Sequence, residues 1–132
     1  NALLMATTTM DAIRMIGMPE ARIILSQCAV YLATSAKSNT AYMAIEKALA
    51  LVQQTGALPV PLHLRNAPTK LMKELNYGSG YTYAHDFEGN FAQQAYLPDA
   101  INGQVFYEPG QNQTEDRIRQ KMKEDWKGMY PY

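Results

Sequence analysis

The sequence predicts an all-α fold, an orthogonal array of about five helices with one long irregular segment rich in aromatic residues. Two observations lead to this class. Apolar residues recur at intervals of three and four in several stretches of the first 56 residues, and again near the C-terminus. This is the spacing of one face of an α-helix. Between residues 78 and 112, five glycines are interspersed with seven aromatic residues, a composition typical of turns.

Length and charge limit the number of domains and the kind of partner. A chain of 132 residues, 47% of them apolar, is expected to build one core. We predict a helical domain over residues 1–112, with an irregular wrap from about residue 78, and a peripheral helix and tail over 113–132. Twelve basic and twelve acidic residues balance overall, so no net charge steers the chain to nucleic acid. Basic residues are in excess up to residue 77 and acidic residues after it.

Three helices are predicted in the first 56 residues. The first covers residues 3–16 and stops at Gly17. The second begins with Pro19 and extends to residue 37. It is apolar over more than half of its circumference, so we expect it to be largely buried, with Cys28 in the core. The third covers residues 41–55 and is closed by Gly56.

The stretch from residue 59 to residue 78 is expected to be a rigid connector. Two prolines at its start favour an extended backbone. Pro68 is placed to begin a helix of about nine residues, on which Leu71 and Leu75 are predicted to face inward. A helix this short depends on tertiary packing for its stability.

The aromatic residues of the irregular segment are expected to anchor it on the helices, because so long an irregular stretch needs side-chain contacts to order it. A short helical turn is predicted near residues 91–95. Thr114 is predicted to cap a last helix that extends through Trp126. The apolar stripe of this helix is narrow, so the helix is expected to be peripheral.

Motifs of the common enzyme classes are missing. The chain has no phosphate-binding loop, no dinucleotide fingerprint and no serine-hydrolase elbow. We therefore predict no catalytic residue and no bound cofactor for this chain. Two histidines and one cysteine without ligand spacing predict no metal site. His85 and Asp86 leave a stand-alone hydrolase as a remote alternative, although adjacent side chains rarely point at one atom and a role in loop structure is the main interpretation.

A basic group near the predicted short helix could bind DNA or another anion. It consists of Arg65, Lys70, Lys73 and His63. The candidates for stacking against nucleic-acid bases are Tyr77, Tyr81 and Tyr83. In the alternative interpretation, Arg65 holds the loop, the lysines are solvated and the tyrosines are structural anchors.

The predicted helices also carry a candidate surface for self-association. Its residues lie on the second and third helices and are Ile24, Tyr31, Tyr42, Ile45, Leu49 and Val52. Helices that are apolar on more than one side need a second partner besides the core. The sequence leaves open which of these side chains face the core and which face a neighbouring subunit.

Three stretches resemble one protein family. They are "AKSNTAY" (36–42), "TGALPVPLHLRNAPTKLMKELNYGSGYTYAHD" (55–86) and "YLPDAINGQVFYEP" (96–109). They are similar to the C-terminal region of the replication-associated recombination protein A (RarA/MgsA) family of clamp-loader-like AAA+ ATPases, which are related to the Werner helicase-interacting proteins. The similarity extends from about residue 17 to residue 109, whereas residues 111–132 match only loosely.

The resemblance implies a function for a longer parent protein. It implies that residues 1–112 are the helical collar and oligomerisation domain, and that this region forms a homo-tetramer. It also implies that the parent is a cytoplasmic, nucleoid-associated, DNA-dependent ATPase of replication-fork maintenance, recombination and repair. DNA and the single-stranded-DNA-binding protein are implied partners, and no membrane partner is expected. ATP and magnesium are expected in a module that these 132 residues do not contain. No catalytic residue of the family maps onto this sequence, so the chain itself is expected not to be an enzyme.

Overall fold

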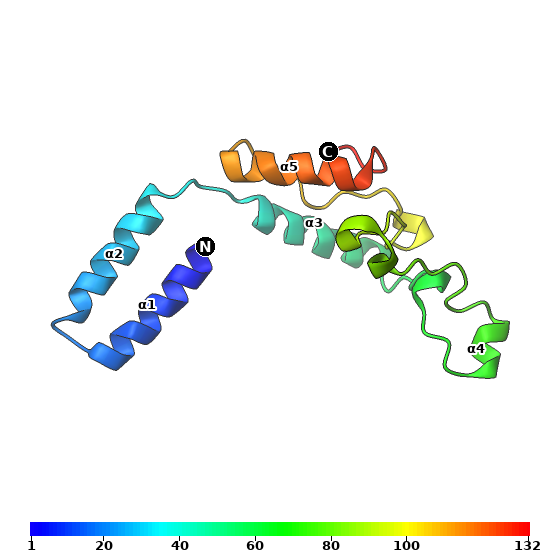
Figure 1. Cartoon of the computed structure of the whole chain (residues 1–132), viewed down its shortest axis with the longest axis horizontal. Helices are drawn as coiled ribbons and strands as arrows, with labels where there is room; N and C mark the ends of the chain where they lie inside the picture. Colours follow the sequence, from blue (N-terminus) through cyan, green and yellow to red (C-terminus); the bar gives the residue numbers. More distant parts are fainter. The chain divides into compact units, whose positions relative to one another are not determined.

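The computed structural model describes all residues from 1 to 132, and it contains five α-helices and no β-strand (Figure 1). The predicted all-α class is therefore confirmed. By its contacts the chain divides into two compact units, Asn1–Lys37 and Ser38–Tyr132. The boundary that the sequence predicts at residue 112 stays a prediction. None of the helices combines the length and the apolar character that a membrane crossing requires.

The first unit is an antiparallel hairpin of α1 (Ala2–Ile16) and α2 (Ala21–Thr34) (Figure 1). Gly17 ends α1 as predicted, because it adopts a positive φ of 76° and donates its N–H to the carbonyl of Ile13 at 2.8 Å. The carbonyl of Gly17 accepts the N–H of Ala21 at 2.9 Å. The second helix therefore begins at Ala21, two residues later than the predicted start at Pro19.

Little of the hairpin is buried. Cys28 is buried, as predicted. The expectation that the second helix is largely buried is wrong for this chain, since Ile23, Leu25 and Val30 are all exposed. Inside its unit α2 packs only against α1, so most of its circumference stays uncovered.

The helix α3 (Thr40–Thr55) opens the second unit and agrees closely with its prediction. Gly56 ends it with a φ of 67° and donates its N–H to the carbonyl of Val52 at 2.9 Å. Ala44, Ala48 and Leu51 are half-buried along one side of the helix. That side is the one on which α3 packs within its own unit.

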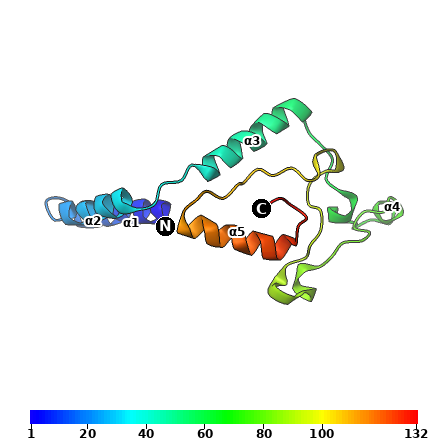
Figure 2. The same ribbon diagram turned by 90° about the horizontal axis from the view of Figure 1, so that it is seen from above.

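The short helix α4 (Lys70–Glu74) differs from its prediction. It has five residues, and Thr69 caps it by accepting the N–H of Met72 with its side chain. Leu71 and Leu75 are exposed, so the prediction that they face inward is wrong. The half-buried side chain of this helix is Met72. Within the second unit, α4 lies at the end remote from α5 in both views (Figures 1 and 2).

The segment between α4 and α5 is irregular, as predicted, and its turns are three 3-10 turns at Ala84–Asp86, Glu88–Asn90 and Asp99–Ile101. Residues 91–95 are not helical, so the turn predicted there is wrong. The segment is anchored where Phe91 and Tyr96 meet Trp126 edge-on, with ring centroids 4.9 and 6.2 Å apart. Tyr130 packs on the same indole at 4.7 Å. Edge-to-face pairs of this kind stabilise a small aromatic core.

The last helix, α5 (Gln113–Trp126), is capped by Asn112 and not by Thr114 as predicted. The side-chain oxygen of Asn112 accepts the N–H groups of Thr114 and Glu115, each at 3.1 Å. Thr114 lies inside the first turn, where its own N–H needs an acceptor. Asn112 is therefore the residue that starts the helix.

Candidate functional site

Four residues of α3 form an uncovered apolar row, which we call the α3 stripe. They are Tyr42, Ile45, Leu49 and Val52, each between 51% and 62% exposed. Their steps of three, four and three residues are those of the seam between two packed helices. The half-buried side of α3 is a different one, so no other part of the second unit covers the stripe.

The other two predicted residues of the self-association surface are on α2. Ile24 is half-buried within the hairpin, and Tyr31 is 36% exposed. They belong to the first unit and the α3 stripe to the second. The structure thus brings four of the six residues together, and the role of all six in assembly stays a prediction.

Residues 62–78, which include α4, form a loop whose two ends meet, and we call this segment the basic lobe. Its two ends are joined by the N–H of Gly78, which donates to the carbonyl of Leu62 at 2.8 Å. Gly78 has a φ of +73°, and a Cβ there would lie 3.2 Å from the carbonyl oxygen of Arg65. Nε of Arg65 donates to the carbonyl of Val60 at 2.6 Å, and its guanidinium lies 4.9 Å over the ring of Tyr77. The base of the lobe is therefore rigid.

The predicted basic residues differ in what they contact. Nε2 of His63 is 2.7 Å from the carbonyl oxygen of Ala95, so His63 and Arg65 are both used to hold backbone in place. Lys70 and Lys73 are exposed, and only Lys70 has an acidic neighbour, Glu74, at 4.0 Å. The two lysines are the cations of this group that a partner can reach.

The predicted stacking tyrosines likewise differ in whether a partner can reach them. Tyr77 is half-buried under the guanidinium of Arg65, whereas Tyr81 and Tyr83 are more than half exposed. The ring of Tyr83 is 5.1 Å from that of His85 and tilted against it. Binding of DNA or another anion by this group stays a prediction.

The pair His85 and Asp86 does not form a catalytic arrangement in this structure. Nδ1 of His85 lies 3.2 Å from the side-chain oxygen of Asn90, and both members of the pair are exposed on a 3-10 turn. No hydrogen bond joins the two side chains. No group of three or more His, Cys, Asp or Glu residues is placed to hold a metal ion.

A buried carboxylate joins the N-terminal ends of α3 and α5. The side chain of Glu115 is only 7% exposed. Its Oε1 accepts the hydroxyl of Ser38 and, at 2.9 Å, the hydroxyl of Thr40, while its Oε2 accepts the N–H of Gly110. The Ser38 hydroxyl is the main cause that lowers the pKa of Glu115 from 4.5, and it outweighs the opposing effect of burial.

The loop before α5 is fitted tightly around this carboxylate. A Cβ at Gly110 would collide with the carboxylate of Glu115 and would lie 3.5 Å from Cγ2 of Thr40. The guanidinium of Arg119 donates to the carbonyls of Pro109 and Gly110 and to the carboxylate of Asp116. Residues from three separate segments are thereby locked at the start of α3.

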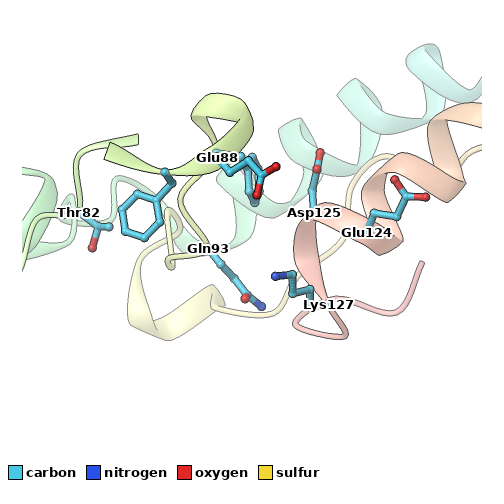
Figure 3. A pocket seen from close by; sticks show the side chains of 8 residues that line it. Thr82, Glu88, Gln93, Glu124, Asp125 and Lys127 are labelled. Atoms are coloured by element: carbon cyan, nitrogen blue, oxygen red, sulfur yellow. The ribbon is translucent and has the colours of Figure 1, made fainter. Parts of the chain in front are cut away.

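A pocket of about 490 Å³ lies beside the C-terminal end of α5, and we call it the acidic pocket (Figure 3). Figure 3 shows Glu88 and Gln93 on one side and Glu124, Asp125 and Lys127 on the other. The full lining is Thr82, Phe87, Glu88, Phe91, Gln93, Glu124, Asp125 and Lys127. The lining thus carries three carboxylates, one ammonium group and two phenylalanine rings.

The sequence places Glu115 in the first turn of the last helix, but it predicts neither the contacts of Glu115 with Ser38 and Thr40 nor the acidic pocket. A signal for Glu115 does exist, because a capping residue followed three positions later by Glu, here Asn112 and Glu115, is a helix-start pattern. The acidic pocket has no such signal, since its residues come from two segments more than thirty positions apart. Only their tertiary arrangement brings these side chains together.

Known proteins resemble this chain along most of its length. Replication-associated recombination protein A of Coxiella burnetii is 42% identical over 124 residues, which are 93% of this chain and 28% of that protein. The protein of the same name in Escherichia coli is 39% identical over 92% of this chain and 28% of its own length. ATPase WRNIP1 of Dictyostelium discoideum is 41% identical over 82% of this chain and 12% of its own length. The chain therefore spans less than a third of these curated relatives.

The expected resemblance is confirmed by these relatives, which carry the family's name. A family model described as "MgsA AAA+ ATPase C terminal" matches residues 1–126. This match and the identities above agree over the same part of the chain. The chain belongs to the C-terminal domain family of the MgsA AAA+ ATPases, which includes the replication-associated recombination proteins A.

Proposed function

We propose that this chain is the oligomerisation domain of a AAA+ ATPase that acts in replication-fork maintenance, recombination and repair, and that it assembles as a homo-tetramer. The observation that carries the proposal is the α3 stripe, an uncovered row of apolar side chains with the spacing of a helix–helix seam. A monomeric protein seldom leaves so continuous an apolar row in water, because its burial is favourable.

The hairpin of the first unit supports the same proposal. Leu3, Leu4 and Met15 are among its many exposed apolar side chains, and a pair of helices alone buries too little apolar surface to be stable. The α3 stripe by itself is also small compared with the ~800 Å² that each partner buries in a typical stable interface. Assembly therefore requires more than one surface of each copy.

The parent protein is proposed to be a DNA-dependent ATPase. ATP and magnesium would be bound by its ATPase module, outside these 132 residues, while the present domain holds the copies together. The names of the relatives, "Replication-associated recombination protein A" and "ATPase WRNIP1", support this proposal. The single-stranded-DNA-binding protein and DNA are proposed partners of the parent.

The oligomeric state of the 132-residue chain tests the proposal. Its mass in solution is expected to be a multiple of 14.8 kDa that is retained on dilution into the micromolar range. A mass of 14.8 kDa at all concentrations would contradict an assembly function of this domain. The measurement needs no ATPase module, so it isolates the contribution of this chain.

DNA binding by the basic lobe is a second candidate function. It is supported by the exposure of Lys70 and Lys73 and of the nearby tyrosines Tyr81 and Tyr83. Two lysine–phosphate contacts are expected to give a slope of about −1.4 when the logarithm of the affinity for single-stranded DNA is plotted against that of the salt concentration. Fluorescence anisotropy with a labelled oligonucleotide measures this slope. Binding that Lys70→Glu/Lys73→Glu leaves unchanged would exclude the lobe as the DNA site.

A further inference from the structure

The tip of the basic lobe carries an uncovered apolar pair. Leu71 is 63% and Leu75 51% exposed, and residues four apart lie on the same side of a helix. Lys70 and Lys73, three residues apart on α4, share the other side of this short helix. Within residues 62–78 there are three Arg or Lys side chains and one acidic side chain, so the lobe is positively charged. A positively charged lobe with an exposed leucine pair at its tip suits an acidic partner surface that also offers apolar contacts.

The acidic pocket has the complementary chemistry. Phe87 is exposed and Phe91 half-buried in its wall. Its charged lining consists of three carboxylates and Lys127, and Asp125 is the only one of the carboxylates in an ion pair, with Lys121 at 3.1 Å. Glu88 and Glu124 have no cationic partner within the chain. The pocket thus offers unpaired negative charge around aromatic rings.

We propose that the basic lobe of one copy docks into the acidic pocket of a second copy. The inference rests on the proposed assembly function and names a contact that produces it. One chain cannot make this contact with itself, because α4 and the C-terminal end of α5 lie far apart in both views (Figures 1 and 2). Each copy carries one lobe and one pocket, so every lobe finds a pocket on a neighbour.

Charge and shape both favour this occupant. Opposite charges on the two surfaces steer them together and disfavour lobe–lobe and pocket–pocket encounters. Leu71 and Leu75 would leave water for the wall formed by Phe87 and Phe91, in a pocket of about 490 Å³. The rigid base of the lobe, closed by the Gly78–Leu62 hydrogen bond, keeps the entropy cost of docking low.

The structure favours a protein surface over a nucleic acid as the occupant of the lobe. The side chains between the lysines are aliphatic, and leucine offers no ring for a base to stack on. Tyr77, the aromatic residue within the lobe, is covered by the guanidinium of Arg65. The α3 stripe and the lobe–pocket contact are also two different interfaces, which is what a tetramer with dihedral symmetry needs.

A charge swap tests the contact. Lys70→Glu/Lys73→Glu reverses the charge of the lobe, and Glu88→Lys/Glu124→Lys reverses that of the pocket. Each double variant is expected to raise the concentration of half-assembly at least about tenfold, because like charges then face each other. The combined chain with all four substitutions is expected to assemble again. Sedimentation velocity measures the assembly, and circular dichroism shows that each variant retains its helices.

The matched control is Lys37→Glu/Arg117→Glu, which changes the charge equally at two exposed residues outside both surfaces. It is expected to assemble like the wild type. If both charge-reversed variants assemble like the wild type, the lobe–pocket contact is wrong and the proposed function stands. A wild-type chain that stays monomeric overturns both. Reduced affinity of Lys70→Glu/Lys73→Glu for single-stranded DNA with unchanged assembly would assign the lysines to nucleic acid and overturn the contact.

Discussion

Leu49→Glu is expected to dissociate the assembled chain while leaving its fold intact. Leu49 lies at the centre of the α3 stripe and is half exposed in the single chain, so a glutamate there stays hydrated in the monomer. In the assembly the same carboxylate would be buried in an apolar seam without a partner, which is costly. A cost of about 2 kcal/mol, the size found for the few residues that dominate an interface, corresponds to about a 30-fold increase in the concentration of half-assembly.

Sedimentation velocity on a dilution series gives this concentration directly. The control is Ala50→Glu, which introduces the same charge at the next residue of α3, outside the stripe, where the side chain is also exposed. It is expected to assemble like the wild type. Equal effects of Leu49→Glu and Ala50→Glu would mean that the charge acts on α3 in general and that the stripe is not the seam.

Glu115→Gln is expected to lower the thermal stability of the chain at neutral pH. The carboxylate accepts hydrogen bonds from Ser38, Thr40 and Gly110, and an uncharged amide in its place would replace these charge-assisted bonds by weaker neutral ones. A decrease in Tm on the order of 5 °C is expected for a domain of this size. The control Glu46→Gln removes an exposed carboxylate that has no ion pair and is expected to leave Tm unchanged.

The effect of Glu115→Gln is expected to depend on pH in a defined direction. The pKa of Glu115 is lowered in the folded chain, so its contribution to stability is fully present above about pH 4.5 and is lost as the pH falls through the lowered value. The difference in Tm between wild type and variant should therefore be constant from pH 7 to about pH 5 and shrink below pH 4.5. Calorimetry at one fixed protein concentration measures it, because assembly makes Tm depend on concentration. A difference that grows on acidification would contradict the assignment of Glu115 as a hydrogen-bonded carboxylate.

The regular helices were the part of the fold that local patterns could predict. In α3, the apolar steps and Gly56 specify a helix and its end without reference to the rest of the chain. Predictions that depended on tertiary partners were confirmed for Cys28, which is buried, but not for the short helix α4. Leu71 and Leu75 were assigned to the interior because they are apolar, but no other element of the second unit covers them. Burial depends on what lies opposite a side chain, and a pattern along one helix does not contain that information.

The candidate surfaces also differ in whether they lie within one helix or between distant segments. The row on α3 was visible in the sequence because all four side chains belong to one helix. Glu115 is recognisable in the sequence as a glutamate at a helix start, but its hydrogen bonds to Ser38 and Thr40 join residues more than seventy positions apart. The acidic pocket likewise combines the turn around Glu88 with the end of α5. Sites that form between distant segments can be identified only from the structure.

The most direct test of the account is light scattering coupled to gel filtration of the wild-type chain across a wide concentration range, with Leu49→Glu run alongside. The wild-type mass is expected to be near four times 14.8 kDa, and the variant is expected to be a smaller species at equal concentration. A wild-type mass of 14.8 kDa at every concentration would contradict the claim that this domain assembles the protein. An equal mass for wild type and Leu49→Glu would show that assembly does not use the α3 stripe.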